Sequence, residues 1–465
     1  MNQYIKYFHV LLSALIFSQH LFATPIISND ITQMNPVQIQ QISQPTSTKQ
    51  VIDLVQSHAG PISIAGGKYS MGGQTTTEQA LQIDIKKMNH IISFDPNKKE
   101  ITVETGMTWR QIQEFIDPYD LSIKIMQSFA NFTVGGSLSV NVHGRYVGEG
   151  PIILSVKQIK IVLADGSLIT ASPTENKEIF YGAIGGYGAL GIITEATLLL
   201  ENNVKIERIS KLMPIDHYKD YFDQHIKNNQ QAIFHNGVIY PPEYRKVRAV
   251  TYAQTDKPLT NTERLTPIQP NYQKQEKQIR FVAKSKIGKQ LRKSHDFFSH
   301  QKPLVQWRNL EASLDVAELG PISNEHSSFV LQEYFIPVAQ FDEFYPQLVE
   351  IIKKHKINII NISIRHTNKD SGSLMAWAKD EMFAFVIYYQ QGTTQQDKLA
   401  VQQWTQELIE ATLSLQGSYY LPYQPHATLE QFNQAYPNAQ SFLKLKQQVD
   451  PTNKFRNKLW DLYLQ

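Results

Sequence analysis

The stretch "SIAGGKYSMGGQ", residues 63–74, decides how this chain is interpreted. It begins within a β-like run, Ile62 to Ala65, and its four glycines are Gly66, Gly67, Gly72 and Gly73. Glycine lets backbone N–H groups approach an anion closely, but glycine clusters are also common in ordinary turns. The stretch matches neither the P-loop pattern nor the G-x-G-x-x-G fingerprint of Rossmann sites. This stretch alone therefore does not indicate a phosphate-bearing ligand, and the other glycine-containing stretches decide the question.

Composition excludes several classes of function. The 465 residues suggest two or three domains, and 42% hydrophobic with 19% charged residues is typical of a soluble globular protein. A net charge of +3 is too small to indicate a nucleic-acid-binding protein. The chain has no cysteine, which excludes disulfides, thiolate nucleophiles, iron–sulfur ligation and cysteine-linked cofactors. Its 14 histidines are scattered without an H-E-x-x-H motif, so no metal site is predicted.

The first 50 residues predict export and a polar arm. An early Lys6 precedes the apolar run Val10 to Phe17, which is too short to cross a membrane and fits the core of a signal peptide. Cleavage near Ala23 predicts a signal peptide over residues 1–23 and a secreted, periplasmic protein. An uncleaved anchor or a buried first helix are the alternatives. Residues 24–50 are polar and rich in Gln, Asn and Thr, so we expect an N-terminal surface arm.

Short strands and turns dominate from Val51 to Glu201. Strands are predicted in "PISIAGG", "LQIDI", "IISFD", "EITVETG" and "LGIITEATLLL", and a helix over residues 109–116. "VKQIKIVLADGSLITAS" predicts a hairpin that turns at Asp165-Gly166. Further on, "FVLQEYFIP" starts a β-α-β-β-α-β order that ends at "GSYYLPY". That order predicts an antiparallel sheet with helices on one face.

A basic stretch, "YQKQEKQIRFVAKSKIGKQLRKSH" at residues 272–295, separates these two regions. Its residues fit a solvated helix and loop. Contact with an anionic lipid surface or an acidic ligand is the alternative.

Five stretches together carry a family resemblance. They are "AGGKYSMGG", "VETGMTWRQI", "FTVGGSLSVNVHGR", "ADGSLITASPTENKEIFYGAIGGYGALGIITEATL" and the C-terminal "AYP…F…DPTNKFRN". In this order they resemble the FAD-binding domain of the vanillyl-alcohol oxidase and p-cresol methylhydroxylase (PCMH-type) flavoproteins. The nearest branch is that of the aldonolactone oxidases and decaprenylphosphoryl-ribose oxidase. The resemblance covers residues 62–200 and 432–463.

The resemblance implies an α+β fold in two parts. A PCMH-type FAD-binding domain is expected over residues 51–202, and a second α+β domain, the substrate cap on an antiparallel sheet, over residues 203–429. Residues 430–465 are expected to return to the FAD domain.

The resemblance also implies which residues hold FAD. The pyrophosphate is expected against Gly66, Gly67, Lys68, Tyr69, Ser70, Met71 and Gly72. Thr105, Gly106, Gly135, Gly136 and Ser137 are expected along the rest of the cofactor, with Ser70 and Ser137 as short donors to phosphate oxygens. Asn141, His143 and Gly144 are expected near the isoalloxazine, and Gly191, Ile192 and Ile193 near the adenine half.

Tyr69 stands where many relatives carry a histidine that bonds covalently to the flavin. With neither histidine at this position nor cysteine anywhere in the chain, we expect non-covalent FAD. A tyrosyl link is chemically conceivable, but in this family it forms elsewhere in the fold.

The substrate side departs further from the pattern. "YLPY", Tyr420 to Tyr423, stands where aldonolactone oxidases have His-Trp-x-Lys, so Tyr423 replaces the pocket lysine. His143 leads the candidates for proton transfer because imidazole titrates near neutral pH. Arg365 is expected to bind a substrate carboxylate or phosphate, or else to pair with Asp370. The remaining polar candidates are Tyr420, Tyr423, His426, Gln332 and Glu333, for each of which packing or an ordinary hydrogen bond is the alternative.

The resemblance implies an FAD-dependent oxidoreductase. The expected reaction oxidises a secondary alcohol of a sugar, aldonolactone or sugar-lipid by hydride transfer to flavin N5, with oxygen or another electron acceptor. Three alternatives stay open: one half of a lipid-linked sugar epimerase pair, an NADPH-dependent flavin reductase, and a non-catalytic sugar- or lipid-binding protein. The epimerase alternative, like the basic stretch, includes contact with a membrane surface.

Overall fold

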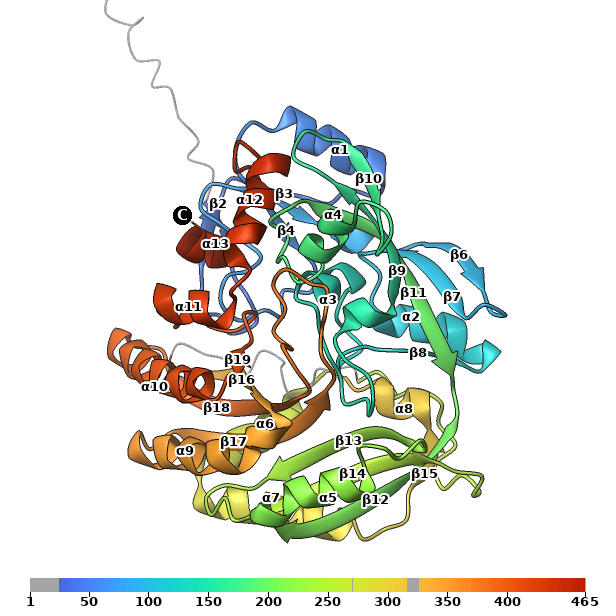
Figure 1. Cartoon of the computed structure of the whole chain (residues 1–465), viewed down its shortest axis with the longest axis vertical. Coiled ribbons are helices and arrows are strands. Elements are labelled where there is room, and N and C mark those ends of the chain that lie inside the picture. The colour runs from blue at the N-terminus through green and yellow to red at the C-terminus, as the bar shows by residue number, and fades with distance from the viewer. Residues whose placement is uncertain (1–24, 270, 316–325, 465) are drawn as a thin grey trace, which may run out of the picture.

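The computed structural model describes residues 25–269, 271–315 and 326–464, so the predicted signal peptide lies outside the described residues. Figure 1 shows two parts: the N-terminal strands and C-terminal helices form the upper one, and a broad antiparallel sheet forms the lower one. The chain passes from upper to lower part between β11 (Ile192–Asn202) and β12 (Lys205–Pro214). The predicted α+β fold is confirmed. Within the described ranges, no helix combines the length and apolarity needed to span a membrane.

The upper part contains two main sheets. The parallel sheet has the order β3 (Gln41–Ser43), β5 (Leu81–Asp84), β4 (Ile62–Ala65). The antiparallel sheet has the order β10 (Leu168–Ala171), β9 (Val156–Val162), β11, β7 (Glu100–Glu104), β6 (Ile91–Asp95), with β8 (Leu121–Ile123) on β11. The strands predicted here and the helix α2 (Trp109–Ile116) are confirmed. At the hairpin turn Gly166 has φ +84°, the left-handed conformation that Asp-Gly favours.

The surface arm predicted over residues 24–50 is not found in the described part of this segment, residues 25–50. They form β1 (Ile26–Ser28), β2 (Val37–Ile39) and β3, and β3 adds to the parallel sheet beside β5. Some of their polar side chains, such as Asp30 and Thr32, are buried and hydrogen-bonded: Thr32 donates to Asp30 through its backbone N–H (3.0 Å), and Asn35 Nδ2 donates to Asp30 Oδ2 (2.7 Å). Composition alone misleads here, since a satisfied polar group can be buried at low cost.

The lower part is one eight-stranded antiparallel sheet. Its order is β15 (Val305–Trp307), β12, β14 (Lys246–Gln254), β13 (Ala232–Ile239), β17 (Asn358–Thr367), β18 (Met382–Gly392), β16 (Ser327–Pro337), β19 (Ser418–Tyr419). The predicted β-α-β-β-α-β order is confirmed, with α9 (Phe341–Lys354) and α10 (Gln395–Ser414) as its helices. The strands β12 to β15 were not predicted, although β14 is buried over seven consecutive residues. A strand buried on both faces shows no alternation to detect.

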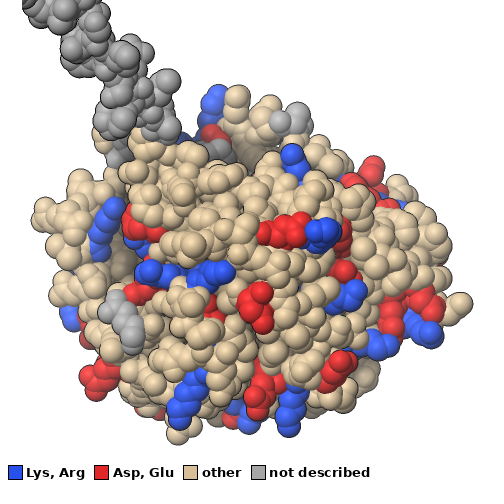
Figure 2. All heavy atoms as spheres, turned by 90° about the horizontal axis from the view of Figure 1, so that it is seen from above, with Lys and Arg blue, Asp and Glu red and all other residues tan. Residues whose placement is uncertain are grey.

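The two faces of this sheet are covered differently. Phe385 of β18 packs against Phe344 of α9, and Tyr389 packs against Trp404 of α10. The other face is covered beside β17 by α6 (Gln273–Lys284) and α7 (Lys286–Ser299), the basic stretch (Figure 1). The prediction of helices on one face, made for the helices of the β-α-β-β-α-β order, is therefore confirmed for α9 and α10. Seen from above in Figure 2, the molecule carries Lys and Arg interspersed with Asp and Glu.

The C-terminal helices pack on the N-terminal sheet. They are α11 (Leu429–Ala435), α12 (Ala439–Val449) and α13 (Lys458–Tyr463). The Ile62 N–H donates to the Lys454 carbonyl (2.7 Å), and Phe455 is fully buried in the core beneath β4. Trp460 Nε1 donates to the Gly186 carbonyl (2.9 Å). The start and the end of the chain thus share one core.

A buried lysine fixes this arrangement. Lys446 of α12 is 4% exposed, and its Nζ lies 2.8 Å from Asp450 Oδ2. The same ammonium donates to the carbonyls of Ala189 (3.1 Å) and Phe455 (2.9 Å). Asp450 in turn accepts from the backbone N–H groups of Lys454 and Phe455. One charge pair thereby joins the helix, the tail and the loop before β11.

We expect Lys446→Met to lower the free energy of unfolding by about 3 kcal/mol or more, because it leaves the Asp450 carboxylate buried without its partner. Chemical denaturation followed by circular dichroism measures this. Lys444→Met, on the exposed side of the same helix, is the matched control and should change stability by less than about 0.5 kcal/mol. Equal effects of the two substitutions would contradict the role given to Lys446.

Candidate active site

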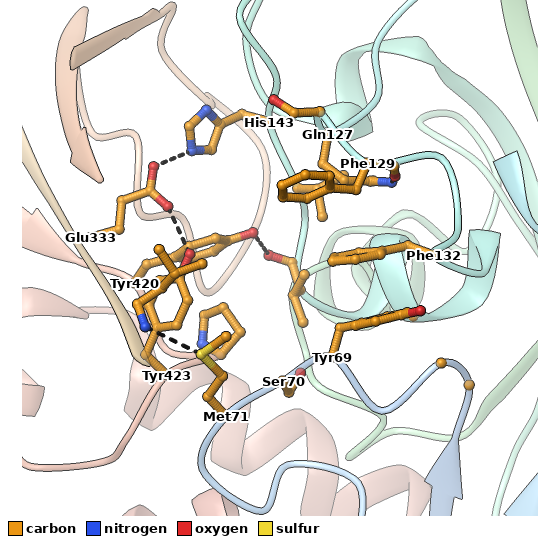
Figure 3. A pocket seen from close by; sticks show the side chains of 18 of the residues that line it. Tyr69, Ser70, Met71, Gln127, Phe129, Phe132, His143, Glu333, Tyr420 and Tyr423 are labelled. Atoms are coloured by element: carbon orange, nitrogen blue, oxygen red, sulfur yellow. Dashed lines mark hydrogen bonds and ion pairs between the residues drawn. The ribbon is translucent and has the colours of Figure 1, made fainter. Parts of the chain in front are cut away.

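A pocket lies where the upper part meets the eight-stranded sheet of the lower part, here called the cap sheet (Figure 3). The space between its walls, together with the open solvent at its mouth, is about 910 Å³. One wall is the glycine loop after β4, a second is the segment 127–133, and the third comes from the cap. The residues that contribute polar or aromatic side chains are Tyr69, Ser70, Thr75, Gln127, Ser128, Phe129, Phe132, Thr133, His143, Glu333, Arg365, Tyr420 and Tyr423.

A second pocket, of about 540 Å³, continues from the first toward the core of the upper part. The two share the lining residues Gly66, Ser70, Thr75, Gly136 and Val140. The second is also lined by the predicted residues Gly135, Gly191 and Ile193. Together they form an elongated space, as a long dinucleotide requires.

The glycine loop fits a ligand that approaches the backbone. A Cβ on Gly66 would clash with the Thr133 hydroxyl, so this position excludes any side chain. Two buried hydroxyls at the pocket surface, Thr75 Oγ1 and Ser128 Oγ, have no hydrogen-bond partner in the described part of the protein. Unpartnered buried hydroxyls are costly and indicate that a polar ligand completes their bonding. These residues fit FAD, with the glycine loop and Thr75 available to its phosphates.

The loop is held in place by the chain that carries the two pocket tyrosines. The Met71 N–H donates to the Pro422 carbonyl (2.7 Å). Gln74 Nε2 donates to the carbonyls of Leu421 (2.7 Å) and Tyr423 (2.8 Å). A Cβ on Gly72 would clash with the Tyr423 carbonyl, so this glycine serves the close packing of the two segments. The cofactor loop and the substrate side are therefore one connected structure.

Tyr69 forms a flat aromatic wall. Its ring stacks on Phe132 with centroids 4.3 Å apart and 7° between the planes (Figure 3). Burial, and then the charge of Asp315, raises the pKa of the Tyr69 hydroxyl, so the phenol stays protonated at neutral pH. Its neighbour Lys68 turns away: Lys68 Nζ donates to Gln82 (2.7 Å) and Ser28 (3.0 Å), and its ammonium is not directed at the pocket.

A polar network lies opposite this wall (Figure 3). His143 Nε2 is 2.6 Å from Glu333 Oε1, and the Tyr423 hydroxyl donates to Glu333 Oε2 (3.2 Å). His143 and Glu333 are 4% and 3% exposed. The Tyr420 hydroxyl donates to the Val140 carbonyl (2.8 Å). The structure thus brings together three predicted residues, His143, Glu333 and Tyr423.

The charges of this network favour an ionised carboxylate. Burial raises the pKa of Glu333, but the charge and hydrogen bond of His143, the Arg365 guanidinium and the Tyr423 hydroxyl together hold it below its ordinary value. Burial and the Glu333 charge raise the pKa of Tyr423 well above its ordinary value, so Tyr423 remains a donor. Arg365 lines the pocket, and its buried Nε has no hydrogen-bond partner among the described residues.

Three sequence-based interpretations on the substrate side need correction. Gln332 faces away from the pocket, because neighbours on β16 point to opposite faces, and its Nε2 donates to Thr405 (2.8 Å) and Tyr389 (3.0 Å). His426 does not line the pocket. Asp370 does not pair with Arg365; it accepts from Asn141 Nδ2 (2.8 Å).

Several predicted cofactor residues lie behind the pocket surface. The Ser137 hydroxyl is fully buried between Trp109 Nε1 (2.8 Å) and Gln127 Oε1 (2.9 Å), so it positions Gln127 and cannot reach a phosphate. Asn141 bonds to Asp370 and Ser373. Thr105, Gly106, Gly144 and Ile192 also lie outside both sets of lining residues. Their contacts, such as Gly135 N–H to the Thr105 carbonyl (2.8 Å), support the loops that do line it.

The sequence analysis missed Thr75, Gln127, Phe129 and Phe132 as site residues. The last three lie within the six residues before "TVGGSLS", and Phe132 belonged to a stretch quoted for the resemblance. The position of these residues before a glycine-containing helix start was the available signal.

Comparison with known proteins agrees with this layout. Residues 39–172 match the family model of an FAD binding domain, and residues 197–463 match that of D-arabinono-1,4-lactone oxidase. The chain is 24% identical to L-gulonolactone oxidase of Bos taurus over 46% of this chain and 48% of that protein. It is 31% identical to D-arabinono-1,4-lactone oxidase of Yarrowia lipolytica over 30% of this chain and 27% of that protein. It is 30% identical to cytokinin dehydrogenase 1 of Arabidopsis thaliana over 33% of this chain and 27% of that protein.

The matched regions span at most about half the length of these curated relatives. The lactone oxidase model, however, covers 267 of the 465 residues of this chain. The chain therefore belongs to the D-arabinono-1,4-lactone oxidase family of PCMH-type flavoproteins, with an FAD-binding domain ahead of the family's second domain.

Proposed function

We propose that this protein is an FAD-dependent oxidoreductase that oxidises a secondary alcohol of a sugar lactone or a related sugar, with oxygen as the electron acceptor. The observation that carries the proposal is the His143–Glu333–Tyr423 network in a pocket that continues into the glycine-lined space. The names of two relatives, L-gulonolactone oxidase and D-arabinono-1,4-lactone oxidase, support a lactone as the first substrate class to test.

Bound FAD would accept the hydride that leaves the alcohol carbon, and the protein would orient the substrate and take up the hydroxyl proton. Glu333 suits the second task because its lowered pKa keeps it ionised at neutral pH. Tyr423, held protonated, donates to Glu333 and keeps the carboxylate in position, and its oxygen can accept a hydrogen bond from the substrate hydroxyl. The Tyr69–Phe132 stack closes the opposite side and limits water.

Export is a separate part of the proposal. It rests on the apolar run at residues 10–17 alone and agrees with an enzyme that uses oxygen and needs no NADPH.

We expect Glu333→Gln to lower kcat on a panel of aldonolactones and sugar alcohols by about 100-fold or more, because the carboxylate that accepts the proton is lost. Bound flavin, measured by absorbance, should stay unchanged. Glu407→Gln is the matched control: Glu407 also pairs with a histidine, His355 (2.7 Å), but at the surface of α10. A Glu333 variant within threefold of the wild-type rate would exclude this role.

His143 should set the pH range of activity. Glu333 is ionised above its lowered pKa, and activity is lost as the pH falls through that value. His143→Gln removes the largest influence that lowers this pKa, so burial dominates and the acidic limb of kcat/KM should move to higher pH. His355→Gln is the control and should leave the profile in place. If the acidic limb of the kcat/KM profile of His143→Gln is unchanged or moves to lower pH, His143 does not lower the pKa of Glu333 as assigned.

FAD should be released by acid, because Tyr69 stands where many relatives carry the histidine that bonds covalently to the flavin. Precipitation of the yellow protein with trichloroacetic acid should leave the flavin in the supernatant. Flavin that stays with the pellet would show a covalent bond, and loss of that bond in Tyr69→Phe would assign it to this residue.

A further inference from the structure

The geometry points to a membrane-docking surface on α6 and α7: we propose that this helix pair binds an anionic lipid bilayer. Residues 272–295 hold eight Lys or Arg and one acidic residue, a net charge of +7. The whole chain carries only +3, so the remainder is net negative at −4. The basic character of the protein is therefore concentrated in one helix pair, unlike the interspersed charges of the face in Figure 2.

Exposed apolar side chains accompany these charges. Ile287, Leu291 and Phe298 of α7 are 70%, 56% and 64% exposed, and their spacing of four and seven residues places them on one face of the helix. Phe281 of α6, 50% exposed, lines the same groove as Leu291. Large apolar residues exposed together have no reason to face water and mark an interaction surface.

Lysines flank this apolar stripe. Lys274, Lys277 and Lys284 of α6 are exposed, and their spacing of three and seven residues places them on the face that also carries Phe281. A surface that combines Lys with Phe, Leu and Ile fits a bilayer with anionic headgroups, where apolar side chains enter the acyl boundary and ammonium groups meet phosphates. A soluble acidic partner would need only the lysine charges to bind and would leave the apolar side chains exposed to water.

The inner side of the pair is fixed to the cap sheet. Asn358 Nδ2 donates to the Ala283 carbonyl (3.1 Å), and Lys289 Nζ donates to Asn358 Oδ1 (2.8 Å). Lys293 pairs with Glu243 (3.1 Å). None of these contacts uses a residue of the apolar stripe. The helix pair is therefore joined to the cap sheet while the stripe stays exposed.

The docking surface lies on the pocket side of the cap sheet. Val386 of β18 lines the active-site pocket, and Tyr388, two residues further, lines the groove between α6 and α7. Residues two apart on a strand point to the same face. Binding would therefore turn the pocket side of the cap toward the bilayer.

Vesicle sedimentation tests the proposal with the full chain. We expect binding to vesicles of 30% phosphatidylglycerol in phosphatidylcholine to exceed binding to pure phosphatidylcholine at least tenfold, and to weaken in 0.5 M NaCl. Lys274→Gln/Lys277→Gln/Lys284→Gln should weaken it about 100-fold, since each lysine near an anionic surface contributes about 1 kcal/mol. The control changes three exposed lysines of the upper part, Lys49, Lys86 and Lys98, to Gln and should bind like the wild type.

A second variant tests the apolar stripe. Ile287→Ser/Leu291→Ser/Phe298→Ser should weaken vesicle binding at least tenfold, and unchanged circular dichroism would show that the fold is kept. Equal binding to both vesicle types, or full binding by either variant, would overturn the proposal. If the serine variant binds vesicles like the wild type and the lysine variant no longer binds DNA or polyglutamate, the ligand of this surface is a soluble polyanion instead. Self-association abolished by the serine variant, without vesicle binding, would indicate a second copy of the chain.

Discussion

The contact between His143 and Glu333 is the interaction on which the site depends. His143 follows the glycine-containing helix of the FAD-binding domain, and Glu333 lies on β16 of the cap, 190 residues later. Both side chains are almost fully buried, so the Glu333 carboxylate depends on the His143 ring, the Arg365 guanidinium and the Tyr423 hydroxyl for its stabilisation. The pair thereby joins the cap to the FAD-binding domain, and it holds the carboxylate to which we assign proton uptake.

The same constraint explains why the tail of the cap is bound so closely to the glycine loop. Gln74 and the Met71 N–H bond to the carbonyls of residues 421–423, so a shift of the loop would move Tyr423 away from Glu333. Gly72 allows the two segments to approach because any side chain there would strike the Tyr423 carbonyl. The glycines at residues 66–73 thus allow two close contacts, since Gly66 packs against Thr133 at the pocket and Gly72 packs against the cap.

The sequence predicted the strands of the FAD-binding domain and the second half of the cap because their patterns are local: alternation, an Asp-Gly turn, a run of 3.6-residue periodicity. It did not predict β14, whose buried residues show no alternation, or the burial of Asp30, whose partners are set by tertiary structure. In the site, the glycine stretches located the pocket, but the sequence could not separate Glu333 from Gln332. Only the register of β16 decides which of two adjacent polar side chains faces the pocket.

Tyr423, the residue that departs most from the family pattern, is consistent with the charges around it. Glu333 already lies beside the His143 ring and the Arg365 guanidinium, and Arg365 is so buried that desolvation lowers its pKa. A lysine at residue 423 would place a further cation beside one carboxylate, in surroundings that penalise every unpaired charge. A neutral phenol can donate the same hydrogen bond without that cost. The phenol therefore keeps a donor on Glu333, and Arg365 on β17 lines the pocket with its positive charge.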